Sequence, residues 1–223
     1  MESDCRLFED LSPGKASVRG YLHVPANAPN DGLVITHGAG ANCKSPLLVA
    51  IADAFCRSGV TVLCCDLPFR QLRPHGPPPR GSAGSDQEGL RGAVEALRKQ
   101  VPGRVFLGGH SYGGRQSSIL AASEPRLADA LLLLSYPLHP PKTATKLRTA
   151  HFPDLRTTVL FVHGTRDPFG SIDEMKTVLR LIPSPTRLLV VDGAGHELLT
   201  ARNRSTLPDK IVNAFATFIA APK

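Results

Sequence analysis

The chain has 223 residues, of which 42% are hydrophobic and 20% are charged. This length and composition suit one globular domain over residues 1–223 and exclude a disordered chain. The formal net charge is +7, but the basic residues are scattered, which favours a generally basic surface over a nucleic-acid-binding face.

No apolar run is long enough to span a membrane, and residues 1–4 lack the basic, then apolar, start of a secretory signal. We therefore expect a cytoplasmic protein with no membrane partner. The five cysteines are odd in number and form no C-x-x-C pair, so neither a disulfide framework nor a metal site is expected.

The chain then alternates between strand-like and helix-like segments. Residues 1–16 are polar, and residues 17–24 alternate in the manner of a half-exposed outer strand. Six continuously apolar runs follow, at 33–36, 60–65, 105–107, 130–134, 159–162 and 188–191. Helical patterns occupy 47–58, 86–100 (with Ser85 as its cap), 113–123, 171–181 and 208–220. Continuous apolar strands between helices predict a doubly wound, mostly parallel sheet covered on both faces.

Two connections are longer than the others. Residues 67–85 are rich in Pro and Gly and look too irregular for a helix. Because they follow a strand, they fit either a loop over an active site or a disordered surface loop. Residues 136–156 also follow a strand and are expected near the pocket rim.

The sequence Gly109-His110-Ser111-Tyr112-Gly113 has the form of a nucleophile elbow between an apolar strand and a helix. A sharp turn that lifts a serine out of the sheet requires close backbone approach, which favours glycine two residues before and after it. Ser111 is therefore the predicted nucleophile, with a plain Gly-rich turn as the alternative.

A serine hydroxyl needs a base, and the base needs an acidic partner. Of the eight histidines, only His196 follows the last strand, in a loop of small residues, while His110 should point away from the nucleophile. Asp167 follows the strand at 159–162 and is the predicted acid, with Asp173 and Glu174 as fallbacks in the next helix.

The stabilisation of a developing oxyanion requires two backbone N–H groups. One is expected from Tyr112, at the start of the helix after Ser111. The other is expected from Ala39, in the small-residue loop 37–41 that follows the strand at 33–36.

These motifs, in this order, resemble the α/β-hydrolase fold over residues 17–220. More narrowly, the segment from Ser135 to Lys142, with Lys146 to Arg148 after it, resembles predicted hydrolases grouped with testis-expressed protein 30 and, more distantly, the dienelactone-hydrolase-like set. The resemblance implies an eight-stranded, mostly parallel sheet with one antiparallel strand near its start. It also implies the roles given above for Ser111, Asp167 and His196. Dienelactone hydrolases proper carry a cysteine at the elbow, where this chain has Ser111.

The residues therefore predict a cofactor-independent serine hydrolase that acts on a small acyl ester, thioester or amide through an acyl-enzyme. A non-catalytic binding or scaffold protein of the same fold is the alternative. Residues after the presumed carboxyl ends of strands are candidates for lining the pocket: Phe69, Arg70, Tyr136, Leu138 and Phe169. Arg70 is expected to meet either an anionic acyl group or a surface carboxylate.

Overall fold

The computed structural model describes residues 4–12, 14, 16–27 and 30–221. The strands are β1 (Asp4–Asp10), β2 (Val18–Val24), β3 (Gly32–Thr36), β4 (Thr61–Asp66), β5 (Val105–His110), β6 (Leu131–Leu134), β7 (Val159–Gly164) and β8 (Thr186–Val191). The helices are α1 (Pro46–Arg57), α2 (Pro68–Leu72), α3 (Ala83–Arg98), α4 (Tyr112–Ser123), α5 (Ile172–Leu179) and α6 (Leu207–Ala220), with a short 3₁₀ helix η1 (Phe152–Asp154).

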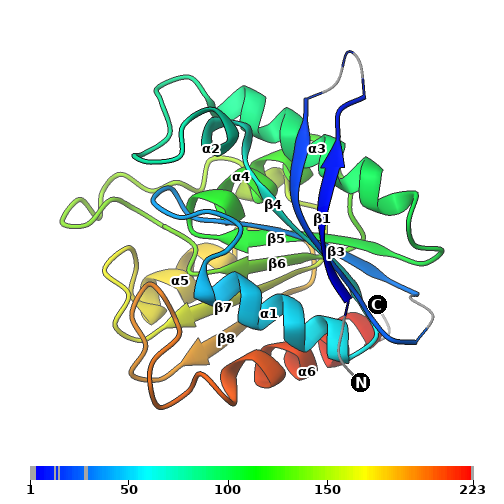
Figure 1. Cartoon of the computed structure of the whole chain (residues 1–223). Coiled ribbons are helices and arrows are strands. Elements are labelled where there is room, and N and C mark those ends of the chain that lie inside the picture. Colours follow the sequence, from blue (N-terminus) through cyan, green and yellow to red (C-terminus); the bar gives the residue numbers. More distant parts are fainter. Residues whose placement is uncertain (1–3, 13, 15, 28–29, 222–223) are drawn as a thin grey trace.

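All eight strands belong to one sheet, in the order β1-β2-β4-β3-β5-β6-β7-β8. Strand β2 runs antiparallel to both of its neighbours, and the other pairs are parallel. The predicted mostly parallel sheet of about eight strands is therefore confirmed. The loops that follow the parallel strands gather at one edge of the sheet, on the left of Figure 1.

Helices cover both faces of the sheet, which explains why the central strands, β3 to β7, are largely apolar and buried along their length. Alternate residues of a strand point to opposite faces. Leu33 and Ile35 of β3 pack with α1 and α6, whereas Val34 packs with α3 on the other face. The two layers are visible on either side of the strands in Figure 1. Burial on both faces holds the strands in place, and their carboxyl ends therefore form a rigid base for the loops that follow them.

Aromatic packing secures the α1 and α6 layer to the centre of the sheet. The Phe215 ring of α6 lies edge-on to Phe55 of α1 at 5.7 Å and to Phe106 of β5 at 5.2 Å between centroids. Such edge-to-face pairs contribute beyond the area they bury. This cluster anchors β5, the strand that leads to Ser111.

Residues 67–85 were expected to be too irregular to form a helix, and this expectation was wrong. It contains helix α2 and the first turn of α3. Pro68 starts α2, where its missing N–H costs nothing. The buried carboxylate of Asp86 accepts from the Phe69 N–H at 3.1 Å and so ties the two helices together. Ser85 lies inside α3 rather than at its cap, and its hydroxyl donates to the Ser82 carbonyl.

The polar N-terminal stretch was predicted without a strand of its own, but residues Asp4–Asp10 form β1, an edge strand. Cys5 is exposed there, and the other four cysteines are buried; all are free thiols. Within the described ranges, none of the helices combines the length and the apolar character needed to cross a membrane.

Candidate active site

Ser111 stands at the turn between β5 and α4, with a positive φ of 51° that is uncommon for a residue other than glycine. The chain around it is packed too tightly for side chains. A Cβ on Gly109 would lie 2.8 Å from the Gly113 carbonyl carbon, and one on Gly113 would lie 2.5 Å from the His37 oxygen. The Ser111 N–H donates to the Leu134 carbonyl at 2.8 Å. The strained turn is thus held by the sheet on one side and the glycines on the other.

His196 lies in the loop after β8 and reaches over the strand ends to Ser111. Its Nε2 is 2.8 Å from the Ser111 Oγ. The Phe169 ring packs against the imidazole with 4.3 Å between centroids, and His110 Nε2 donates to the His196 carbonyl oxygen at 2.9 Å. His196 is therefore held in place both at its imidazole ring and at its backbone carbonyl.

Asp167 follows β7 and completes the chain of hydrogen bonds. Its two carboxylate oxygens lie 2.9 and 3.0 Å from His196 Nδ1, and one of them also accepts from the Phe169 N–H at 2.9 Å. Burial raises the pKa of this carboxyl, but the hydrogen bond and charge of His196 and the Phe169 N–H outweigh burial, so its pKa lies below the ordinary value. Asp167 is thus an anion near neutral pH.

The partners of His196 fix its tautomer. A carboxylate can only accept, so Nδ1 carries the proton and donates to Asp167. Nε2 is then free to accept the Ser111 hydroxyl proton. The structure brings Ser111, His196 and Asp167 together, whereas the fallback acids stay in α5: Glu174 caps that helix with Ser171, and Asp173 lies beside Lys176.

The loop from His37 to Ala41 faces the start of α4. His37 is fully buried; its Nδ1 donates to the Gly38 carbonyl at 2.8 Å, and its Nε2 accepts from the Leu67 N–H at 3.2 Å. Burial lowers the pKa of His37, which agrees with this neutral tautomer. Among the hydrogen bonds of the described residues, none uses the N–H of Ala39 or of Tyr112. Both predicted oxyanion donors are therefore available.

Arg70 takes a different role from either one predicted. Its side chain is buried, and its guanidinium donates to four backbone carbonyls. Two of them, Ala39 and Ala41, belong to the predicted oxyanion loop, at 2.8 Å each. The other two are Arg73 and Gly76, in the segment after α2. Within the described part of the chain Arg70 pairs with no carboxylate, and it holds the loop that carries Ala39.

The other residues predicted to line a substrate pocket are mostly inside the core. Phe69, Tyr136 and Leu138 are at most 3% exposed, so their position after strands did not indicate an open surface. Phe69 packs edge-on to Tyr112 at 5.8 Å and so supports α4 from behind. Of the predicted set, only Phe169 is partly exposed beside the site.

A groove that the sequence did not reveal is lined in part by Glu197, the residue that follows His196. It encloses about 540 Å³ and is lined by Pro46, Leu47, Ala50, Glu197, Leu199 and Arg204. These residues come from the first turns of α1 and from the loop that begins at His196. The apolar side chains at the start of α1 can be recognised in the sequence. Their position beside the loop after β8 becomes apparent only in the folded chain.

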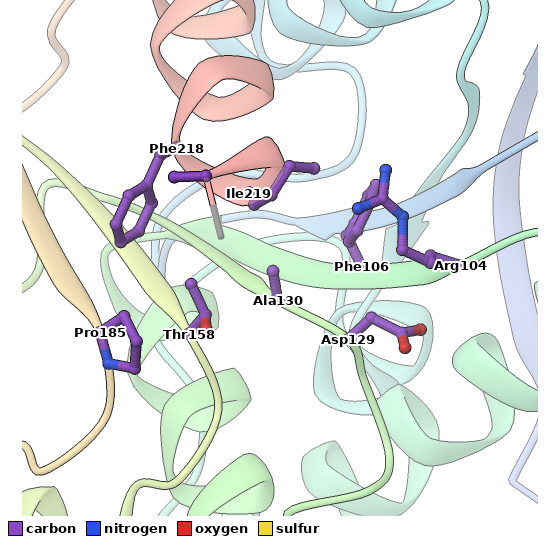
Figure 2. Close-up of a pocket in the computed structure, with 9 residues that line it drawn as sticks. Arg104, Phe106, Asp129, Ala130, Thr158, Pro185, Phe218 and Ile219 are labelled. Atoms are coloured by element: carbon purple, nitrogen blue, oxygen red, sulfur yellow. The ribbon is translucent and has the colours of Figure 1, made fainter. Parts of the chain in front are cut away.

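A second hollow, of about 320 Å³, opens at the other edge of the sheet, as Figure 2 shows. Phe218 and Ile219, at the end of α6, lie on one side of this hollow, and Ala130 lies across from them. Its charged residues already have partners: Arg104 pairs with Asp31 at 2.7 Å, and Asp129 accepts from the Val105 N–H at 2.9 Å. This hollow contains none of the predicted site residues. Nor do the described residues form a cluster of side chains that could hold a metal ion.

Comparison with known proteins agrees with this architecture. A family model described as an alpha/beta hydrolase domain matches residues 29–221. Among solved structures, the dienelactone hydrolase of Anabaena variabilis is similar with a TM-score of 0.77 at 20% identity, covering 97% of this chain and 99% of that one. Est1E of Butyrivibrio proteoclasticus is similar with a TM-score of 0.75 at 16% identity, covering 96% and 99%. An α/β serine hydrolase without a lid from Xanthomonas campestris gives 0.72 at 15% identity, covering 100% and 99%. At sequence identities this low, the similarity shows only that the fold is shared.

Proposed function

Because the chain belongs to the alpha/beta hydrolase family, we propose that it is a cofactor-independent serine hydrolase that cleaves a carboxylic ester or thioester of a small molecule. The observation that carries the proposal is the continuous relay from Ser111 Oγ to His196 Nε2 at 2.8 Å and from His196 Nδ1 to Asp167 at 2.9 Å. These are the contacts that nucleophilic catalysis by serine requires.

In the first half of the reaction, Ser111 Oγ attacks the acyl carbon while His196 takes the hydroxyl proton. The negative charge that develops on the carbonyl oxygen is stabilised by the N–H groups of Ala39 and Tyr112. His196 then gives its proton to the leaving alcohol or thiol, and Ser111 becomes the acyl-enzyme. Asp167 stays ionised and stabilises the imidazolium that forms in each step.

In the second half, water replaces the leaving group. The oxygen of the water molecule attacks the acyl carbon while His196 accepts one of the water protons. His196 then gives this proton to Ser111 Oγ as the carboxylic acid departs. The groove that Glu197 helps to line, with its apolar side chains from α1, is a place for one arm of the substrate. No step requires a metal or an organic cofactor.

The test is hydrolysis of p-nitrophenyl esters of increasing acyl length by the purified chain and by Ser111→Ala. We expect turnover of at least one ester, and a loss of at least about a thousandfold in kcat for Ser111→Ala. Ser123→Ala, an exposed serine at the end of the same helix, serves as the matched control and should keep full activity. Equal activity in wild type and Ser111→Ala would contradict the proposal, and a folded chain without turnover would favour a binding protein.

A further inference from the structure

Helix α2 contacts both of the segments that carry the proposed oxyanion donors. The Phe69 ring lies edge-on to the His37 ring at 5.6 Å and to the Tyr112 ring at 5.8 Å between centroids. His37 begins the loop that contains Ala39, and Tyr112 is the first residue of α4. Phe69 is only 3% exposed. Because protein interiors are close-packed, a buried ring that contacts both sides resists a change in their separation.

Arg70 of α2 holds the side that carries Ala39. The Arg70 Nε donates to the Ala41 carbonyl, and a terminal guanidinium nitrogen donates to the Ala39 carbonyl, each at 2.8 Å. The turn between these residues is closed by the Ala41 N–H, which donates to the Gly38 carbonyl at 3.1 Å. A guanidinium is planar and presents its donors in a fixed fork. The two bonds from Arg70 therefore fix the orientation of this turn relative to α2.

Asp86 of α3 holds the side that carries Tyr112. Its Oδ2 accepts from the Tyr112 hydroxyl at 2.7 Å, and its Oδ1 accepts from the Phe69 N–H at 3.1 Å. Burial raises the pKa of the Tyr112 hydroxyl to about 12, so this hydroxyl stays protonated and donates at neutral pH. Asp86 is fully buried. One buried carboxylate therefore ties the first residue of α4 to the backbone of α2.

Helix α2 is itself seated on α3. A Cβ on Gly89 of α3 would lie 2.5 Å from two ring carbons of Pro68, so the proline packs directly on the α3 backbone. Ser82 Oγ also donates to Asp86 Oδ2 at 3.1 Å, just before α3 begins. A helix of five residues is not stable alone, so its position is set by such contacts.

We propose that Arg70 and Asp86 are positioning residues for the reaction. Through α2 they set the separation of the two N–H groups that stabilise the oxyanion, those of Ala39 and Tyr112. The inference rests on the proposed function, because the oxyanion forms only when Ser111 attacks an acyl carbon. A change in this separation acts on the transition state and leaves the binding of the ester nearly unchanged. A misplacement of about 1 Å can lower the rate about a hundredfold.

Arg70→Met and Tyr112→Phe test the two sides separately. Tyr112→Phe removes the hydroxyl that donates to Asp86 and keeps the N–H of residue 112. With the best p-nitrophenyl ester, we expect kcat to fall about 10- to 100-fold in Arg70→Met and about 3- to 10-fold in Tyr112→Phe, with KM within about twofold of wild type. Arg80→Met, at an exposed position, and Tyr21→Phe, on β2, make matched changes elsewhere and should keep the wild-type kcat.

The affinity for a transition-state analogue separates positioning from a loss of folded protein. The Ser111 oxygen adds to the carbonyl carbon of trifluoroacetone, its proton passes to His196, and the ketone oxygen becomes an alkoxide in the place of the oxyanion. The dissociation constant of this adduct, measured by fluorine NMR, should rise in each variant by the factor by which kcat/KM falls. The melting temperature of each variant checks folding, and Tyr112→Phe decides the test if Arg70→Met does not fold.

The outcomes distinguish this role from the hydrolase proposal. Turnover by wild type with an unchanged kcat and analogue affinity in a folded variant would overturn the positioning role of the side that it tests and leave the hydrolase standing. A higher KM with an unchanged kcat would also overturn it, because it would show an effect on substrate binding alone. Neither turnover nor adduct formation by wild type would contradict the hydrolase, and the positioning role with it.

Discussion

At the scale of single residues, the site depends on which atom of each group carries a proton. Asp167 accepts from the Phe169 N–H as well as from His196, so its carboxylate is oriented from two directions. That orientation holds the proton of His196 on Nδ1 and leaves Nε2 to face Ser111. An acceptor-only side chain at position 167 is therefore essential to the proposed chemistry.

Asp167→Asn should lower kcat by about a thousand- to ten-thousandfold while the fold persists. An amide can donate to Nδ1, which would place the imidazole proton on Nε2 and remove the base. Steady-state kinetics with the best ester of the panel measures the effect. Asp173→Asn, the exposed fallback in α5, is the control; a larger loss there than in Asp167→Asn would show that the acid is misassigned.

The candidate triad could be predicted from sequence because each residue lies in the turn or loop that follows a strand, and parallel strands have their carboxyl ends at one edge of the sheet. The role of Arg70 could not, because its partners are backbone carbonyls that leave no trace in side-chain pattern. His110 was expected to point away from the nucleophile, and no pattern in the sequence indicates that its ring donates to the His196 carbonyl. That contact depends on where a distant loop folds back.

At the scale of elements, the strand predictions succeeded for a physical reason. Strands covered on both faces read as continuous apolar runs, and these are hard to mistake. Helix α2 and strand β1 lack that signal. Helix α2 is held by Asp86 from α3, and β1 is an exposed edge strand whose pairing comes from β2. Local sequence alone does not encode such support.

The turn at Ser111 gives a prediction for the element that presents the nucleophile. Gly109→Ala should lower the free energy of unfolding by about 1–3 kcal/mol, because the new Cβ would lie 2.8 Å from the backbone of Gly113 and 2.9 Å from the Thr36 oxygen. Urea unfolding measures it. Gly40→Ala, where a Cβ would have open space, should change stability by less than about 0.5 kcal/mol. Equal effects of the two substitutions would refute the close packing of the elbow.

At the scale of the whole molecule, many histidines are held neutral inside a basic protein. Burial lowers the pKa of each of the following residues: His23, His37, His110, His151 and His163. The unfolded chain accepts these protons near pH 6.5, whereas the folded chain resists them. The net charge of +7 adds repulsion as further protons bind.

Stability should therefore fall on acidification. For His151, whose pKa is lowered to about 4, the contribution is complete above pH 6.5 and is lost progressively as the pH falls from 6.5 to about 4. Each such proton changes the free energy of unfolding by at most about 1.4 kcal/mol per pH unit. Urea unfolding at several pH values measures the slope. His151→Gln should make the slope of the free energy of unfolding against pH shallower. His75→Gln, at an exposed position, should leave this slope unchanged. An unchanged slope in His151→Gln would show that the burial of His151 does not contribute to the loss of stability.

The central claim is that the Ser111 hydroxyl is a nucleophile activated by His196. Incubation of the folded chain with a fluorophosphonate, followed by peptide mass spectrometry, tests this claim without knowledge of the substrate. The predicted result is one covalent adduct on the peptide that contains Ser111, formed much more slowly in His196→Ala. No adduct on the folded chain, an adduct at another residue, or the same labelling rate in His196→Ala would contradict the account.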